Sequence, residues 1–282
     1  MVAGRYLRAA MPFTFLPHQA PVLPLLGRGQ RVDPRFDGVA LVIGSMAPDL
    51  LYVLSGTGFA FDSHALVPLL WTSVPLTVAL CLMFRRWMAA PLAAHLPDGG
   101  LLHLRDFGTV ARRRPVWVVT VASAIVGAVS HVVLDSFTHK DGWAVQHWAP
   151  LRAVVFTRHG IGYHVSSVLQ YSLSFLGAGL TLGWLWWAGR QRLLLADGTR
   201  NPLPATTRLS RRRFLVVTAV AAVLGLVVLV VTPGYGSSVA AFMRGAVVFL
   251  AGLGLASWWA GRSIDRAMPP PGGDRQREMV LP

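Results

Sequence analysis

The sequence predicts an all-α membrane protein, a polytopic bundle of about five or six transmembrane helices. Hydrophobic residues make up 54% of the 282 residues, and charged residues only 13%. A soluble domain of this size cannot bury so much apolar surface, whereas lipid can solvate it. The net charge is +14, but the arginines flank long apolar runs instead of forming a patch on a polar domain. This pattern excludes nucleic acid as a partner and indicates the lipid bilayer.

Four apolar runs are each close to the roughly 20 residues that a spanning helix requires. They cover residues 64–84, 115–138, 161–187 and 214–232, and a fifth run, 238–260, is long enough but carries Arg244. A sixth run, 38–61, contains Pro48 and predicts a broken or re-entrant helix. Residues 13–26 are proline-rich and too short to span, so we expect them at the interface or against the bundle.

The distribution of arginine predicts how the chain crosses the membrane. The segments 85–114 and 188–213 are rich in arginine, whereas the segment 139–160 holds only Lys140, Arg152 and Arg158. Because basic loops stay in the cytoplasm, we expect a multi-pass inner or plasma membrane protein with both termini inside and segment 139–160 outside. The expected domains are a membrane-embedded metal-site domain (1–187), a basic cytoplasmic loop (188–213), two further spans (214–260) and a disordered tail (261–282).

One run carries an unusual set of polar residues. His131, Asp135 and His139 recur at every fourth position, so a helix places them on one face, about 6 Å apart per step. Ionisable residues inside a span are costly and are candidates for function. Imidazole and carboxylate on one face suit zinc, manganese or iron. The alternative is a polar seam between helices, or an ordinary histidine at a helix end.

The expected orientation gathers more ligand-type residues near this face. It places His131, Asp135 and His139 in the outer half of their span, with His64 and His164 at the outer ends of neighbouring spans. Asp49 follows Pro48 in the broken segment, where it could also cap a half-helix. Arg244, near the outer end of the last span, either reaches the membrane surface or pairs with a phosphate near these residues.

Several of these stretches together resemble an uncharacterised bacterial membrane family, the domain-of-unknown-function family 4184. The stretches are Met11-Pro-Phe-Thr-Phe, His18, Ile43-Gly-Ser-Met-Ala-Pro-Asp-Leu, Ser63-His64, residues 127–139 and Asp141-Gly-Trp-Ala-Val-Gln-His147. The resemblance runs from about residue 11 to residue 176. That family is similar to inner-membrane metal-dependent hydrolases, and more distantly its order of histidines and aspartates is similar to that of zinc-dependent phospholipase C and P1-type nucleases.

The resemblance implies a ligand set. Asp49, His64, His131 and Asp135 would hold one metal ion, and His18 and Asp135 would share a second. His139, with His147 or His164, would hold another ion only incompletely. The third ion of the distant relatives needs a glutamate, and the one glutamate of this chain is Glu278 in the tail. We therefore expect one or two divalent ions, most simply zinc.

The sequence thus favours a membrane-embedded metal-dependent hydrolase, with a phospholipid or other lipid-phosphate ester at the outer leaflet as its substrate. Asp135 or Asp49 would bridge metal ions or accept a proton. Two alternatives remain: a transporter that moves metal ions or protons along the His/Asp seam, and a structural membrane protein with a buried polar network. The sequence leaves the oligomeric state open.

Overall fold

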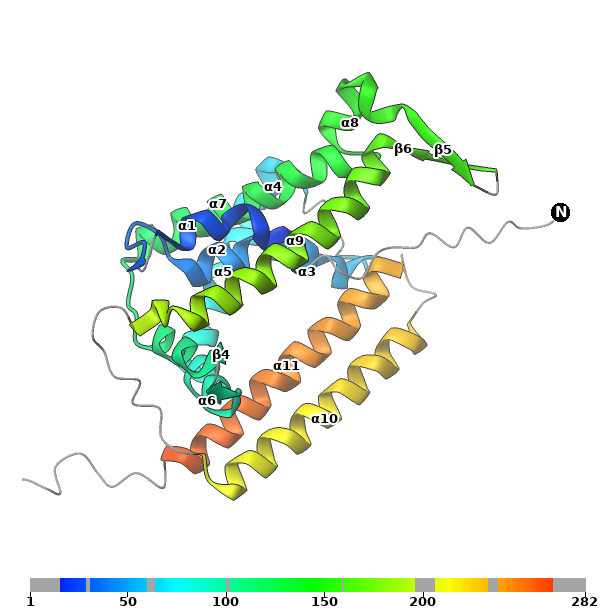
Figure 1. Cartoon of the computed structure of the whole chain (residues 1–282). Helices are drawn as coiled ribbons and strands as arrows, with labels where there is room; N and C mark the ends of the chain where they lie inside the picture. The colour runs from blue at the N-terminus through cyan, green and yellow to red at the C-terminus, as the bar shows by residue number, and fades with distance from the viewer. Residues whose placement is uncertain are drawn as a thin grey trace, which may run out of the picture.

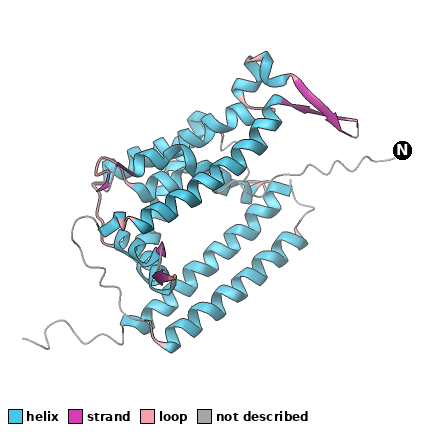
Figure 2. Ribbon diagram, in the orientation of Figure 1, coloured by secondary structure: helices cyan, strands magenta, loops and turns pink. Residues whose placement is uncertain are grey.

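The protein is a helical membrane protein, as the sequence predicts. The computed structural model describes residues 16–28, 31–59, 64–99, 102–158, 160–195, 206–232 and 238–265. Five helical runs are long and apolar enough to cross a membrane: Leu66–His95, Trp117–His147, Val165–Arg190, Arg208–Val231 and Val239–Arg262. Strands are short and form three two-stranded pairs in the described chain (Figure 2). The expected tail began at residue 261, but residues 261–265 are helical, and residues 266–282 and 1–15 lie outside the described residues.

The segment around Pro48 is a broken helix, and this prediction is confirmed. It consists of α2 (Gly38–Gly44), α3 (Ala47–Leu50) and the 3-10 helix η2 (Leu51–Leu54). Pro48 lies in the first turn of α3, where the missing backbone N–H costs no helical hydrogen bond. The fold therefore has five candidate spans and this interrupted segment packed among them.

The chain before α2 packs against the bundle. Its elements are the 3-10 helix η1 (Pro17–Val22), α1 (Leu23–Leu26), and the paired strands β1 (Gly27–Arg28) and β2 (Arg31–Val32). Val22, Leu23 and Leu26 form a buried cluster with Leu41 of α2. The segment η1 contacts both α7 and α9, which agrees with the expected packing against the bundle.

The first span continues beyond its predicted end at residue 84. It comprises α4 (Leu66–Trp71), α5 (Ser73–Met83), the π-helical turn η3 (Phe84–Met88) and α6 (Ala89–His95). Arg85 therefore lies within the helix and not in a loop, because its guanidinium pairs with the buried Asp37. The strands β3 (Asp98–Gly99) and β4 (Leu102–His103) and the 3-10 helix η4 (Leu104–Ala111) follow.

Two long helices, α7 (Trp117–Thr138) and α9 (Val165–Arg190), run through the middle of the protein (Figure 1). Between them lie α8 (Trp143–His147), the 3-10 helix η5 (Ala149–Arg152) and an antiparallel hairpin of β5 (Val154–Arg158) and β6 (Ile161–His164). The expected start of a helix at residue 161 is thus wrong, because residues 161–164 pair with β5 and the helix begins at Val165.

The last two spans, α10 (Arg208–Val231) and α11 (Ser238–Asp265), pack side by side as an antiparallel pair (Figure 1). The short 3-10 helix η6 (Leu193–Leu195) lies between α9 and α10 in sequence. The helix α10 begins six residues before the predicted position of 214, because Thr207 caps it and accepts a hydrogen bond from the Ser210 N–H. The helix α11 contacts η2, α3 and α6.

The backbones of α2 and α7 touch each other, and two glycines make this contact. A Cβ on Gly127 of α7 would lie 2.4 Å from the Leu41 carbonyl oxygen, and one on Gly44 of α2 would lie 2.7 Å from the Ala124 carbonyl oxygen. Small residues permit such an approach between helices in membranes. Beside this contact, Ala40, Ala124 and Ala128 are fully buried.

Asp37 anchors the start of α2 to the first span and to α7. Its Oδ1 accepts the Val39 and Ala40 N–H groups and so caps α2. Its side chain also pairs with Arg85 and accepts the Thr120 hydroxyl at 2.7 Å, and its N–H donates to Ser123 Oγ at 2.9 Å. Burial alone would raise the pKa of Asp37, but the hydrogen bonds from Arg85 and Thr120 outweigh burial and hold the pKa below its ordinary value.

The contact at Gly127 yields a stability prediction. We expect Gly127→Ala to lower the free energy of unfolding by about 1–3 kcal/mol, because the added methyl group meets backbone atoms that cannot rotate away. The matched control is Gly183→Ala in α9, where an added Cβ meets nothing within 4 Å. Thermal unfolding in detergent measures both variants. Equal melting temperatures for the two variants would contradict the importance of the α2–α7 contact.

Candidate metal centre

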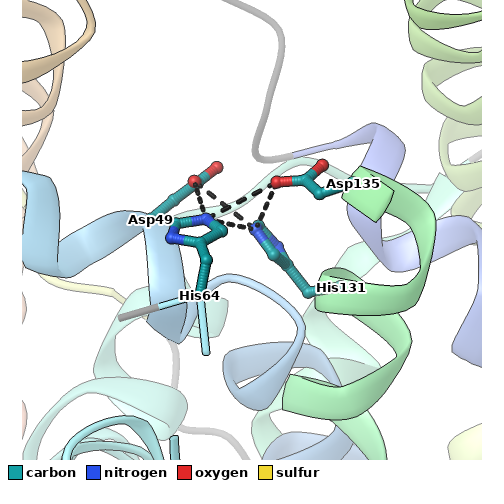
Figure 3. Close-up of side chains that lie close together, drawn as sticks. All are labelled: Asp49, His64, His131 and Asp135. Atoms are coloured by element: carbon teal, nitrogen blue, oxygen red, sulfur yellow. Dashed lines mark hydrogen bonds and ion pairs between the residues drawn. The ribbon is translucent and has the colours of Figure 1, made fainter. Parts of the chain in front are cut away.

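Four ligand-type side chains from three parts of the chain converge on one point (Figure 3). Asp49 comes from α3, in the broken segment. His64 precedes α4, and His131 and Asp135 are one turn apart on α7. One ligand atom from each lies within 4.8 Å of those of the other three, so the group could hold a metal ion.

The ligand atoms of this cluster are nearly equally spaced. His131 Nε2 lies 3.3 Å from His64 Nε2, 3.4 Å from Asp49 Oδ1 and 3.3 Å from Asp135 Oδ2. His64 Nε2 lies 3.4 Å from Asp49 Oδ1 and 3.5 Å from Asp135 Oδ2. Two imidazole nitrogens and two carboxylate oxygens therefore surround one small volume.

The second oxygens of the two carboxylates face two further histidines. Asp135 Oδ1 lies 3.0 Å from His18 Nε2 and 3.3 Å from His139 Nδ1. Asp49 Oδ2 lies 3.8 Å from His18 Nδ1. Asp135 thus has one oxygen in the four-residue cluster and the other on His18 and His139. The structure brings together all six residues that the sequence analysis proposed as ligands.

Two neighbours that the sequence did not reveal orient these histidines. The Ser45 carbonyl oxygen lies 2.8 Å from His131 Nδ1, so Nδ1 carries a hydrogen and donates it there, and Nε2 faces the cluster. The Gln170 amide nitrogen lies 3.3 Å from His139 Nε2. A backbone carbonyl leaves no signal in a sequence, and Gln170 is an ordinary polar residue of α9.

The aspartates of the cluster have different ion-pair partners from the other buried aspartates. Among the described residues, the buried aspartates are Asp33, Asp37, Asp49, Asp106 and Asp135. Three of them pair with arginine: Asp33 with Arg35, Asp37 with Arg85, and Asp106 with Arg192. Within the part of the chain that the structure describes, the ion-pair partners of Asp49 and Asp135 are imidazoles. An imidazole compensates a buried carboxylate only while it is protonated, so a metal ion bound at this cluster would take the place of those protons.

The two ligands that precede the first span carry shifted pKa values. Burial alone would raise the pKa of Asp49, but the neighbouring His131 and His64 outweigh it and hold the pKa below its ordinary value. Burial lowers the pKa of His64, and its hydrogen bonds to Asp135 and Asp49 raise that pKa by more, so it lies above its ordinary value. Asp49 is therefore ionised, and a metal ion must compete with a proton for His64.

The cluster opens on one side. His131 is fully buried, whereas the side chains of His64 and His139 are 21% and 44% exposed. Close to this opening in sequence, Leu66 of α4 and Phe137 of α7 are exposed apolar residues. A molecule would reach the cluster past His64 and His139.

Three other residues that the sequence analysis considered lie elsewhere. His147 stacks on Trp143, and His164 Nδ1 donates to the Arg152 carbonyl oxygen, so neither joins the cluster. Arg244 of α11 donates from Nε to the Val53 carbonyl oxygen at 3.2 Å and from Nη2 to the Ser55 carbonyl oxygen. Its guanidinium therefore ties the last span to the end of η2, between Asp49 and His64.

Comparison with known proteins identifies a family. No curated protein and no solved structure matches the chain. The sequence model of one family, described as "Domain of unknown function (DUF4184)", matches residues 11–260. The match extends past residue 176 into α10 and α11, farther than the resemblance in the sequence indicated. Because it spans most of the 282 residues and includes all six converging side chains, the chain belongs to the DUF4184 family.

Proposed function

We propose that this protein is a membrane-embedded metal-dependent hydrolase of a lipid-phosphate or related ester. The observation that carries the proposal is the convergence of Asp49, His64, His131 and Asp135, whose ligand atoms all lie within 4.8 Å of one another. A tetrahedral zinc ion with bonds of about 2.0–2.2 Å separates its ligand atoms by roughly 3.3–3.6 Å. The five separations given above run from 3.3 to 3.5 Å. The donor set and its spacing therefore fit zinc.

A second ion would be held by fewer residues. His18 Nε2 and His139 Nδ1 both face Asp135 Oδ1, so Asp135 would bridge the two positions. The Gln170 amide would turn its oxygen toward His139 Nε2, which frees the Nδ1 lone pair for the ion. Three protein ligands leave coordination positions for solvent or substrate, as catalytic zinc sites require. We propose two divalent ions, the first enclosed by four residues and the second open.

Bound metal would supply Lewis-acid activation of water and of an ester oxygen. Asp49 Oδ2 faces away from the four-residue cluster and is the oxygen we assign to accept the proton of the attacking water. Hydrolysis would join the water oxygen to phosphorus, break the ester bond and return the proton to the departing alcohol.

Transport of metal ions or protons along the polar residues of α7 is the second candidate. Thr120 and Ser123 continue the polar face of α7 toward its start, and both form hydrogen bonds with Asp37. The backbones of α2 and α7 meet at Gly44 and Gly127 between this group and the cluster. Asp37 is also already paired with Arg85. These two features favour a hydrolase, in which nothing needs to cross the membrane.

The distribution of arginine supports an orientation with the cluster on the outside of the cell. Asp141→Cys, in the exposed segment after α7, should react with a membrane-impermeant thiol reagent in intact cells. Pro97→Cys, in the exposed segment after α6, should react only after the cells are opened. Cys81, the single cysteine of the chain, is buried and gives little background. Labelling of Pro97→Cys but not Asp141→Cys in intact cells would reverse the orientation and place the cluster inside.

Purified protein should retain one or two equivalents of a transition metal, measured by mass spectrometry of the metal. His131→Ala and Asp135→Ala should each lose most of it, because each removes a ligand and leaves the site incomplete. His147→Ala is the matched control, since His147 lies outside the cluster and should leave the metal content unchanged. Stoichiometric metal in the His131→Ala/Asp135→Ala double variant would refute the ligand assignment.

Hydrolysis and transport give opposite results in one experiment. In sealed vesicles, the hydrolase should release product from a lipid-phosphate panel, lose this activity on chelation and regain it with zinc or manganese. His64→Ala should abolish turnover and still insert into the membrane, because insertion depends on the apolar spans. Metal or proton uptake that is lost in Asp135→Ala, without cleavage of any ester in the panel, would establish the transporter instead.

A further inference from the structure

The segment between α7 and α9 concentrates exposed apolar side chains. Among the described residues, six large hydrophobic side chains are exposed outside the five candidate spans. Four of the six lie in residues 148–156: Trp148, Val154, Val155 and Phe156, each between 48% and 55% exposed. On the spans, contact with lipid accounts for exposed apolar residues. Outside the spans, a group of them marks a surface that binds something.

These side chains are exposed although the segment has a buried core of its own. Ala144, Val145 and Leu151 are buried and pack against the start of α9. At the end of α7, a Cβ added to Gly142 would lie 2.6 Å from the Ser136 carbonyl oxygen, so the two backbones touch there. The base of the segment is thus fixed to both spans, and the exposed apolar side chains lie outside this core.

The hairpin of β5 and β6 presents these side chains on an ordered support. The Phe156 ring stacks on Tyr163, its partner across the strands, with 4.6 Å between ring centroids. The Val165 N–H closes the base of the hairpin by donating to the Ala153 carbonyl oxygen at 2.9 Å. All five residues of β5 are exposed. The hairpin extends sideways from the ends of α7 and α9 (Figure 1), a direction that lies along a membrane surface.

The position and the charge of the segment indicate lipid as what covers it. It begins after Thr138 and ends before Val165, where two spans end and start, so both of its ends lie at the edge of the bilayer. Residues 139–164 contain three Lys or Arg residues and a single acid, Asp141. Tryptophan, tyrosine and basic residues are enriched where a protein meets lipid headgroups, and basic segments attract anionic lipids.

We propose that the hairpin and Trp148 lie on the surface of the bilayer, among the headgroups of anionic lipids. Val155 and Phe156 contact the boundary between headgroups and acyl chains, and Arg158 contacts lipid phosphate. The hairpin would thereby hold the end of α7, which carries Asp135 and His139, at the level of the headgroups. This membrane contact does not depend on the hydrolase proposal, because it needs neither a metal ion nor a reaction.

Quenching of a fluorophore by lipids tests the proposal on the full chain. Thr157→Cys, at an exposed position of β5, carries an environment-sensitive fluorophore, and Cys81 is buried and gives little background. The protein is reconstituted in vesicles of phosphatidylcholine and phosphatidylglycerol, some with a nitroxide near the lipid headgroup. We expect this nitroxide to quench the fluorophore. Quenching should weaken when phosphatidylglycerol is left out, and Arg158→Gln should remove the difference between the two vesicles.

A second substitution asks whether the apolar side chains make the contact. Val155→Asp should lose most of the quenching, because it brings a negative charge to a surface of anionic lipid. Val116→Asp is the matched control, since it changes another exposed valine, directly before the start of α7, and should leave the quenching unchanged. Both side chains are exposed, so the melting temperatures should stay the same and show that the variants are folded.

Three results would overturn the proposal. The first is a fluorophore that lipid nitroxide does not quench, with either the emission of a probe in water or the shifted emission of a probe covered by a second copy of the chain. The second is quenching that is the same with and without phosphatidylglycerol. The third is equal quenching in Val155→Asp and Val116→Asp.

Discussion

Gly44 and Gly127 let the backbones of α2 and α7 touch, and the geometry of the metal centre depends on this contact. Ser45 follows Gly44 directly, and its carbonyl oxygen receives the Nδ1 hydrogen of His131, one turn after Gly127. Asp49 lies four residues further along the same broken segment. A displacement of α2 by the radius of a methyl group would move both the orienting carbonyl and one ligand away from α7. The packing of α2 against α7 therefore also fixes the geometry of the candidate metal centre.

The buried acids show how the fold stabilises charge in an apolar surrounding. Burial of a carboxylate is costly unless a partner compensates it, and Asp33, Asp37 and Asp106 each have an arginine. Among the residues that the structure describes, the ion-pair partners of Asp49 and Asp135 are histidines, which can be neutral. Asp37 thus forms an ion pair with Arg85 of the first span, whereas Asp49 and Asp135 form a group with histidines that could hold a metal ion. This difference separates a structural polar group from a candidate site.

The last two spans pack against the segment that carries the candidate metal centre. Arg244 of α11 holds the carbonyl oxygens of Val53 and Ser55, in the segment that joins Asp49 to His64. The helix α11 also packs on α3 and α6. The family match that continues to residue 260 fits this arrangement. A guanidinium that bonds to backbone carbonyls fixes the path of a loop, and here the loop joins two proposed ligands.

The sequence by itself determined the class of the fold and the composition of the cluster. Apolar length predicted five spans and Pro48 predicted a broken segment, because bilayer thickness and the missing proline N–H act locally. The fourfold spacing of His131, Asp135 and His139 predicted their common face, and the expected orientation added His64 and Asp49 as candidates. His18 entered through resemblance alone. Only the tertiary structure placed Arg85 on Asp37, Ser45 on His131, and residues 161–164 in a strand. Each of these three contacts involves a partner that is distant in the sequence, and one partner is a backbone atom. Such contacts leave no periodic pattern in the sequence.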